Sequence, residues 1–312
     1  MGINVLSLFD GMSCGRIALD RAKIDVDNYY ASEIDGPAIT VTRKNWPCTV
    51  QLGNVSMWRD WDLDWSGIDF LIAGSPCQGF SMAGKMLAFD DPRSKLFFRF
   101  VDILDHIKKH NPNVKFMLEN VRMKPAHMDV ISDMVGVKPL MINSDLVSAQ
   151  SRKRFYWSNW PISTPVDRNI SLIDILEPDL PSDHIGMAVR EKSKCLRVGG
   201  RYSPLGDRHE WDSPFQRVAK NGSPKPSKTK AGCLTGGANS GGKHSDMDIL
   251  HSPYATRRYT VKECERLQTV PDGYTEGVSN TQRYKMLGNG WTVDIIAHLF
   301  SEIPTDLAER SE

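Results

Sequence analysis

Cysteine is scarce in this 312-residue chain, and the six cysteines present do not form the patterns that hold metals. They are scattered, with no C-x-x-C pair and no nearby histidine that would complete a zinc site. The chain is also long enough to bury a sizeable core without disulfides. We therefore expect no metal, and reduced thiols of the kind found in cytoplasmic proteins.

Long hydrophobic runs are missing as well. No apolar stretch approaches the length that crosses a membrane. The N-terminal stretch MGINVLSLF is too short for a signal peptide, and Asp10 follows it where a cleavage site would stand. These absences predict a soluble protein located in the cytoplasm.

Net charge is nearly absent, at +1, but the charges are unevenly distributed. Residues 190–230 contain eleven Lys or Arg against four Asp or Glu. Because this segment is also rich in Gly, Ser and Pro, it is either a loop-rich surface that meets phosphate or a solvated region. Charge alone favours neither reading.

The first 160 residues alternate strand-like and helix-like patterns. Strands are expected at 3–9, 28–33, 49–53, 69–74, 115–121, 139–147 and 154–160, and helices at 14–22, 36–45 and 94–110. The last two strands follow each other too closely for a crossover helix, so they should pair antiparallel. The pattern predicts an α/β fold with a Rossmann-like, mostly parallel sheet, an antiparallel last strand, and a ligand at the carboxyl ends of the strands.

The composition changes after residue 160, where Pro, Gly, Ser and charged residues dominate and the hydrophobic periodicity of helices and strands is lost. We expect a small irregular domain at 161–256. Helical patterns return at Thr260, an N-cap with a Glu three residues on, and across 282–300. Residues 257–312 should pack back on residues 1–160 to form one domain, with the irregular domain inserted into it.

Gly11 and Gly15 follow the first expected strand, where the backbone must turn tightly and approach a ligand. A plain strand-to-helix connection would look the same, because the spacing is not G-x-G-x-x-G and no P-loop lysine follows. Glu33 ends the second strand, where an acid can accept hydrogen bonds from ribose hydroxyls or lie at a helix N-terminus. Together these features predict a nucleoside-bearing cofactor and favour S-adenosylmethionine over NAD.

Cys77 lies just beyond a strand end, within the stretch FLIAGSPCQGFSMAGK. A cysteine becomes a covalent catalyst where a helix N-terminus or a cation lowers the pKa of its thiol. Pro76 stiffens the approach, and the long loop with Gly79 and Gly84 is typical of a lid that closes over substrate. The alternative is a small buried cysteine at a turn.

Polar side chains also end the neighbouring expected strands. Glu119 and Asn120 follow an apolar run, and a carboxyl there needs a partner or can hydrogen-bond the ring nitrogen and amino group of a heterocycle. Arg152 and Arg154 alternate, which puts two guanidinium groups on one face and suggests a planar, anionic substrate. The alternatives are a strand-end Glu that caps a helix or bridges to Arg122, and, for the two arginines, a solvated edge strand.

These stretches, taken in order, make the chain resemble the cytosine-C5 methyltransferase family. The motifs that carry the resemblance are LFDGMSCG, SE, GNV, GSPCQGFS, LENV, QSRKR, RRYTVKECERLQTVP and LGNGWTV. They cover residues 1 to about 160 and 257 to about 300 in the family's order. Several details are similar to the de novo (DNMT3-like) branch, while the branch's regulatory domains are absent, which favours a stand-alone phage or bacterial enzyme.

The resemblance implies a catalytic role for four residues. Cys77 matches the Pro-Cys nucleophile that attacks C6 of a flipped-out cytosine, and Glu119 would hydrogen-bond N3 and the exocyclic amine. Arg152, matching the first Arg of Q-x-R-x-R, would contact the base or stabilise the adduct, and Arg154 would support this site or a phosphate. The remaining residues expected to bind substrate are Gln78, Ser81 and Asn120.

The resemblance also implies S-adenosylmethionine as methyl donor and S-adenosylhomocysteine as product. The cofactor-binding positions it implies are Phe9, Asp10, Gly11, Gly15, Glu33, Asn54, Val55, Pro76, Asn289 and Trp291. Asn54 stands where the family usually has Asp, although its amide oxygen can still accept a bond from the adenine amino group. Residues 161–256 fall where the family keeps its target-recognition domain.

The sequence therefore predicts a monomeric DNA (cytosine-5-)-methyltransferase that has the class I methyltransferase fold and acts on double-stranded DNA. We expect no metal and no membrane partner, and a location in a bacterial cytoplasm or a phage-infected cell. A tRNA cytosine-C5 methyltransferase shares the Pro-Cys and Glu-Asn-Val motifs and is the nearest alternative. A catalytically silent DNA-binding regulator of the same fold is the second, and a dehydrogenase a distant third because the glycine spacing is wrong. Any partner restriction endonuclease is unknown.

Overall fold

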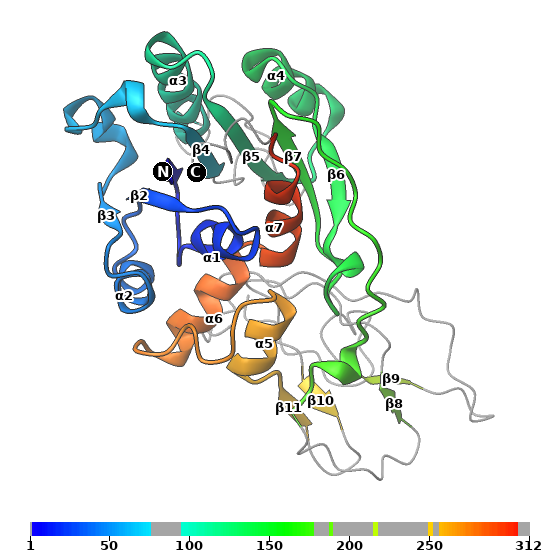
Figure 1. Cartoon of the computed structure of the whole chain (residues 1–312). Coiled ribbons are helices and arrows are strands. Elements are labelled where there is room, and N and C mark those ends of the chain that lie inside the picture. The colour runs from blue at the N-terminus through cyan, green and yellow to red at the C-terminus, as the bar shows by residue number, and fades with distance from the viewer. Residues whose placement is uncertain are drawn as a thin grey trace. The chain divides into compact units, whose positions relative to one another are not determined.

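A computed structural model of the chain describes residues 2–75, 95–177, 187–189, 215–217, 249–251 and 256–304 (Figure 1). Internal contacts divide the chain into two units, which are described separately. The first comprises 1–142, 153–164 and 296–312, and the second 143–152 and 165–295. The boundaries of a target-recognition domain at 161–256 stay a prediction.

A seven-stranded sheet organises the first unit. Its strands are β1 (Ile3–Leu8), β2 (Val26–Ser32), β3 (Val50–Gln51), β4 (Phe70–Gly74), β5 (Lys115–Val121), β6 (Leu140–Asn143) and β7 (Lys153–Ser158). Their order is β3-β2-β1-β4-β5-β7-β6. The pairs from β3 to β5 are parallel, whereas β7 runs antiparallel to β5. The predicted α/β class, with a mostly parallel sheet and an antiparallel strand near one edge, is confirmed.

Seven α-helices and four short 3₁₀ turns fall within the described residues. The helices are α1 (Cys14–Arg21), α2 (Gly36–Asn45), α3 (Lys95–His110), α4 (Pro125–Val135), α5 (Val261–Leu267), α6 (Asn280–Asn289) and α7 (Val293–Ser301). The 3₁₀ turns are η1 (Val55–Asp60), η2 (Trp65–Gly67), η3 (Ser144–Leu146) and η4 (Leu172–Asp174).

Helices bury both faces of the sheet, as the continuous apolar strands require. Leu71 of β4 belongs to one core cluster with Phe97 and Phe100 of α3. Its neighbour Phe70 points to the opposite face because side chains alternate along a strand, and its ring centroid lies 5.0 Å from that of Phe300 at the end of α7. The end of α7, from Ile296 on, therefore belongs to the first unit. Residues 257–295 fall in the second unit, and the expected domain of 1–160 and 257–312 stays a prediction.

Two helical features differ from the sequence-based expectations. Helix α4 lacks a predicted counterpart, although Pro125 starts it and Gly136 ends it with φ 79°. The expected helical stretch at 282–300 is two helices, because Gly290, after α6, is extended with φ −66° and ψ 167°.

The second unit contains short strands and two small helices. Strand β10 (Ile249–His251) pairs antiparallel with β11 (Thr256–Arg258), and β8 (Met187–Val189) with β9 (Phe215–Arg217). Thr260 caps α5 in the predicted manner, since its side chain accepts the Glu263 amide while the Glu263 carboxylate accepts the Thr260 amide.

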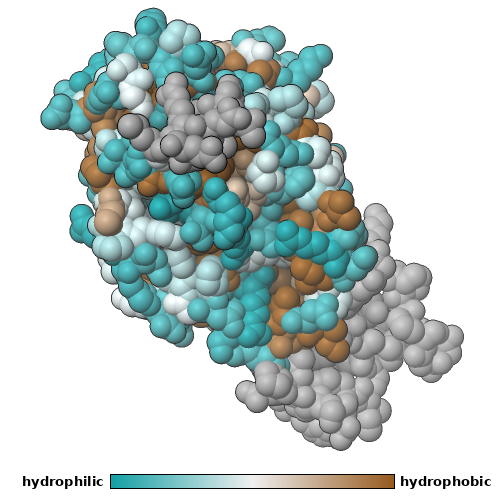
Figure 2. Space-filling view, in the orientation of Figure 1, coloured by the Kyte–Doolittle hydropathy of each residue, from teal (hydrophilic) through white to brown (hydrophobic). Residues whose placement is uncertain are grey.

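The face of the molecule seen in Figure 2 is mainly polar. Figure 2 shows hydrophilic residues over most of the viewed face, with small separate hydrophobic areas between them. Among the described residues, no helix combines the length and the apolar character needed to span a membrane.

Candidate active site

The turn after β1 is built from backbone conformations that few residues adopt. Phe9, Gly11 and Ser13 all have left-handed φ angles, of 58°, 60° and 60°. Gly11 suits this geometry, since it lacks the Cβ that penalises positive φ. A Cβ added there would meet no atom within 4 Å, so the space beside the Gly11 backbone is open. Gly15, by contrast, is buried in the first turn of α1.

Asp10 holds this turn together from inside. Its carboxylate accepts hydrogen bonds from the hydroxyls of Ser7 (2.6 Å), Tyr29 (2.7 Å) and Ser13. Its backbone N–H donates to the Ser32 carbonyl at 3.2 Å. Burial raises the pKa of Asp10 to about 6, although the three hydroxyl bonds act in the opposite direction. Asp10 therefore joins β1, β2 and α1, with its side chain committed to the protein interior.

The carboxylate of Glu33, just after the end of β2, accepts hydrogen bonds from three backbone N–H groups. One carboxylate oxygen accepts the Gly11 N–H at 2.8 Å, and the other accepts those of Ile34 (2.7 Å) and Asp35 (2.8 Å). Because a carboxylate offers about four acceptor positions, these bonds leave room for one more donor. The Ile34 side chain beside it is 74% exposed, an unusual place for a large aliphatic group.

Asn54 follows the end of β3 by three residues, and its side chain bonds within its own turn. Its amide oxygen caps η1 by accepting the Ser56 N–H at 2.9 Å. The next residue, Val55, is buried. The carbonyl of Gly53, the residue before Asn54, accepts a hydrogen bond from the Ser32 hydroxyl at 2.8 Å. The structure therefore brings Asn54 to the end of the sheet near β2 while giving its oxygen a structural partner.

Asn120 anchors the segment that follows β4. Its amide nitrogen donates to the Ser75 hydroxyl at 2.9 Å, and both side chains are buried. Ser75 is the last described residue before residue 95. The predicted site residues Pro76, Cys77, Gln78 and Ser81 lie outside the described residues.

Glu119 pairs with an arginine that comes from the antiparallel strand. Arg154 Nε lies 2.9 Å from Glu119 Oε1, and only 13% and 10% of the two side chains are exposed. In the strand register Glu119 lies beside Gly74 on one side and Tyr156 on the other. Burial of the Glu119 carboxylate was expected to require a partner. Arg154 is that partner, and not Arg122.

In the second unit, Arg152 serves a backbone turn. Its guanidinium donates to the carbonyls of Gly288 (3.2 Å) and Gly290 (3.0 Å), and the residue is only 4% exposed. The predicted cofactor residues Asn289 and Trp291 stand in this same turn. The Arg152 side chain therefore braces the segment that carries them.

Buried glutamines brace the same turn, and the sequence analysis missed them as functional residues. The Gln268 amide donates to the carbonyls of Leu287 (2.5 Å) and Gly290 (3.2 Å), and its oxygen accepts the Thr292 hydroxyl at 2.9 Å. Gln150 in turn contacts Gln268 at 3.3 Å. The signal was present, since both glutamines stand inside motifs of the family resemblance, each two residues from an arginine.

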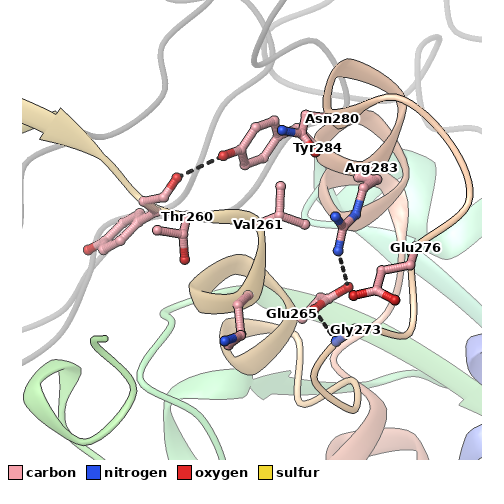
Figure 3. A pocket seen from close by; sticks show the side chains of 10 residues that line it. Thr260, Val261, Glu265, Gly273, Glu276, Asn280, Arg283 and Tyr284 are labelled. Atoms are coloured by element: carbon pink, nitrogen blue, oxygen red, sulfur yellow. Dashed lines mark hydrogen bonds and ion pairs between the residues drawn. The ribbon is translucent and has the colours of Figure 1, made fainter. Parts of the chain in front are cut away.

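A separate cavity of about 540 Å³ lies in the second unit between α5 and α6 (Figure 3). Its walls include Glu265, whose carboxylate pairs with Arg283 at 3.2 Å and accepts the Gly273 and Thr275 amides. Tyr284 donates its hydroxyl to the Tyr259 carbonyl. None of the predicted site residues is among the described residues that line it, so we assign it no role in the reaction.

Comparison with known proteins identifies this arrangement. The model of the C-5 cytosine-specific DNA methylase family matches residues 3–133 and 184–305, most of the chain. The chain belongs to this family. Its predicted enzyme class, DNA (cytosine-5-)-methyltransferase, and the family resemblance are thereby confirmed, while the DNMT3-like branch stays a prediction.

Individual relatives agree with the family assignment. The chain is 25% identical to the type II methyltransferase M.HhaI of Haemophilus parahaemolyticus, over 98% of this chain and 95% of that protein. It is 28% identical to M.Eco47II of Escherichia coli, over 96% of this chain and 80% of that protein. Both names carry the type II methyltransferase label.

Solved structures share the fold at lower identity. Dnmt2 of S. pombe matches with a TM-score of 0.65 and 18% identity, over 99% of each chain. A DNA modification methyltransferase encoded in an E. coli prophage matches with a TM-score of 0.62 and 18% identity, over 99% of this chain and 100% of that one. At these identities the likeness concerns the fold.

Proposed function

We propose that this methylase transfers the methyl group of S-adenosylmethionine to C5 of a cytosine flipped out of duplex DNA, through a covalent bond between Cys77 and C6. The Glu119–Arg154 pair carries the proposal, because it sets a charged, planar recognition element at the sheet edge next to the segment that bears the Pro-Cys motif.

The chemistry explains why a thiol and a carboxyl are needed together. The Cys77 thiolate attacks C6 and forms a C–S bond, and the ring electrons move to C5, which becomes an enamine-like nucleophile. C5 then accepts the methyl group, whose former bonding electrons stay with the sulfur of the donor. A base removes the C5 proton, the C5–C6 double bond re-forms, and the thiolate leaves.

Glu119 and Arg154 would recognise the base, and this division of roles differs from the predicted one. Glu119 would hydrogen-bond N3 and the exocyclic amine, while Arg154, held at 2.9 Å from it, would orient the carboxyl and contact the ring. Arg152 would act indirectly, since its guanidinium is bonded to the Gly288 and Gly290 carbonyls. Asn120 would hold the base of the Pro-Cys segment through Ser75.

The first unit also fits the proposed cofactor, which supplies an electrophilic methyl group when bound. Glu33 retains an acceptor position suited to a ribose hydroxyl, and the open space beside Gly11 lets a ligand approach the backbone. The exposed Ile34 would lie against the flat face of a purine. Asp10 would set the turn without touching the cofactor, because its carboxylate faces Ser7, Ser13 and Tyr29.

Bisulfite sequencing of DNA from a methylation-free host tests the reaction. Expression of the wild type should leave unconverted cytosines in one short sequence context, and Cys77→Ala should leave none. Cys48→Ala is the matched control because Cys48 is an exposed free thiol, and it should methylate as the wild type does.

A trapped complex tests the covalent step separately. Duplex DNA with 5-fluorocytosine at the target lacks the C5 proton that must leave, so the Cys77 adduct should persist on a denaturing gel with wild type and be absent with Cys77→Ala. Methylation by Cys77→Ala would remove the nucleophile assignment. Labelled methyl groups entering tRNA and not duplex DNA would replace the DNA substrate by RNA.

A further inference from the structure

Two histidines lie side by side on α3, within the first unit and outside the proposed active site. His106 and His110 are four residues apart, which places them on one face of the helix. Their ring centroids are separated by 4.6 Å, with an angle of 46° between the rings. Neither residue takes part in the chemistry proposed above.

The hydrogen bond of His110 determines which nitrogen is available. His110 Nδ1 lies 2.9 Å from the His106 carbonyl oxygen. Because a carbonyl only accepts, Nδ1 must carry the proton, and the lone pair of the neutral ring is then on Nε2. A ring N–H bonded to a backbone carbonyl is the usual arrangement of a metal-ligating histidine.

The ring separation matches a chelate. A metal–nitrogen bond of about 2.0 Å places each imidazole centroid roughly 3.2 Å from a shared ion. At a right angle between the two bonds the centroids would be about 4.5 Å apart, whereas a tetrahedral angle would put them at about 5.2 Å. The observed 4.6 Å is closer to the right-angle value, and right angles between ligands are the geometry of tetragonal Cu²⁺ and Ni²⁺ sites.

We propose that His106 and His110 form a two-imidazole site for a late divalent transition metal, Ni²⁺ or Cu²⁺, with the other coordination positions filled by water. Within the described residues, no group of three or more His, Cys, Asp or Glu side chains could hold a metal, so the site depends on these two rings alone.

The surroundings select the kind of ion. The positive charges of Arg59 and Lys109 act on His106 and oppose the approach of a cation. Coordinate bonds from imidazole must supply the affinity, which favours Cu²⁺ and Ni²⁺ over the oxygen-seeking Mg²⁺ and Ca²⁺. The expectation of no metal rested on the absence of cysteine-based patterns, which says nothing about paired histidines along a helix.

Neighbouring tryptophans supply a built-in reporter. The His106 ring is 5.1 Å from the Trp58 ring and 4.8 Å from the Trp65 ring, in edge contact with both. A paramagnetic Cu²⁺ ion bound at His106 should therefore quench the fluorescence of these two indoles.

Titration calorimetry with Ni²⁺ at pH 7.5 tests the site on the full chain. We expect one binding event, at least tenfold weaker in His106→Gln and in His110→Gln and unchanged in His127→Gln, which alters a histidine of α4. At pH 5.5 the wild-type affinity should fall, because protons compete for the imidazole lone pairs. Methylation activity should be unchanged in all three variants.

Electron paramagnetic resonance with Cu²⁺ identifies the ligands directly. Two coordinated nitrogens in the wild type and one in His110→Gln, together with loss of tryptophan quenching, would support the site. Binding of Ni²⁺ within twofold of wild type in both single variants, or a Cu²⁺ spectrum without two nitrogens, would overturn it. Circular dichroism of each variant ensures that a lost site is not a lost fold.

Discussion

The buried carboxylate of Asp10 makes a specific prediction about how stability depends on pH. Its pKa is raised from 3.8 to about 6 because burial disfavours the charged form more than the hydroxyls of Ser7, Ser13 and Tyr29 favour it. The folded protein therefore binds this proton more tightly than the unfolded chain. Stability from this group is fully present below pH 3.8 and is lost as the pH rises through about 6.

The size of the effect follows from the shift. At about 1.4 kcal/mol per pKa unit, the complete effect is about 3 kcal/mol. At pH 5 roughly half of this stabilisation remains, and at pH 7.5 almost none does. The two-state titration therefore gives a loss of about 1.4 kcal/mol in the free energy of unfolding between these two pH values. Asp10→Asn keeps the shape and removes the titration, since the amide oxygen can still accept from Ser7 and Tyr29 and the amide nitrogen can donate to the Ser13 hydroxyl.

Urea unfolding at the two pH values measures this difference. From pH 5 to pH 7.5 the wild type should lose about 1.4 kcal/mol more free energy of unfolding than Asp10→Asn does. Other titrating groups cancel in the comparison, and Asp20→Asn, an exposed Asp of α1, should behave as the wild type. A pH dependence that is the same in wild type and Asp10→Asn would refute the claim that this carboxylate is buried and titrates near 6.

Three further substitutions probe the remaining parts of the argument. Glu33→Gln should weaken S-adenosylmethionine binding at least tenfold in calorimetry. The NH2 group of the glutamine can only donate, so it would face a backbone N–H donor that the Glu33 oxygen now accepts. Unchanged affinity would remove Glu33 from the cofactor site. Arg154→Lys should lower the methylation rate at least tenfold with cofactor affinity within twofold, since a lysine cannot reproduce the guanidinium plane; an unchanged rate would contradict the base-binding role. Glu265→Ala should cost about 3–5 kcal/mol of unfolding free energy, because it leaves the Arg283 charge unpaired, and a loss below about 1 kcal/mol in urea would contradict this.

The central strands β1, β4 and β5 were predictable because each is a mainly apolar run. The sequence assigns 115–121 to a strand, and β5 spans Lys115–Val121. The antiparallel strand near the edge followed from the short connection before β7. Helix α4 was not anticipated, because its exposed face carries the apolar Met134 and so blurs the helical pattern.

The candidate site was predictable as a set of residues but not as a set of contacts. The pattern placed Glu119 and Arg154 at one edge, but only the strand register shows that they meet. Asp10 stood in a recognised motif, yet its contact with Tyr29 depends on how β2 lies beside β1. Arg152 and Arg154 look equivalent in sequence because alternation predicts a shared face, whereas their side chains have different partners.

The position of β7 beside β5 has a consequence for how the protein folds. Helix α4 and strand β6 lie between these strands in the chain, so Glu119 and Arg154 come together only after this intervening segment has been closed into a loop. Closing such a loop costs chain entropy before the strand pairing compensates for it. Recovery of methylation after dilution from denaturant therefore reports completion of the sheet, and it should lag behind the recovery of helical circular dichroism.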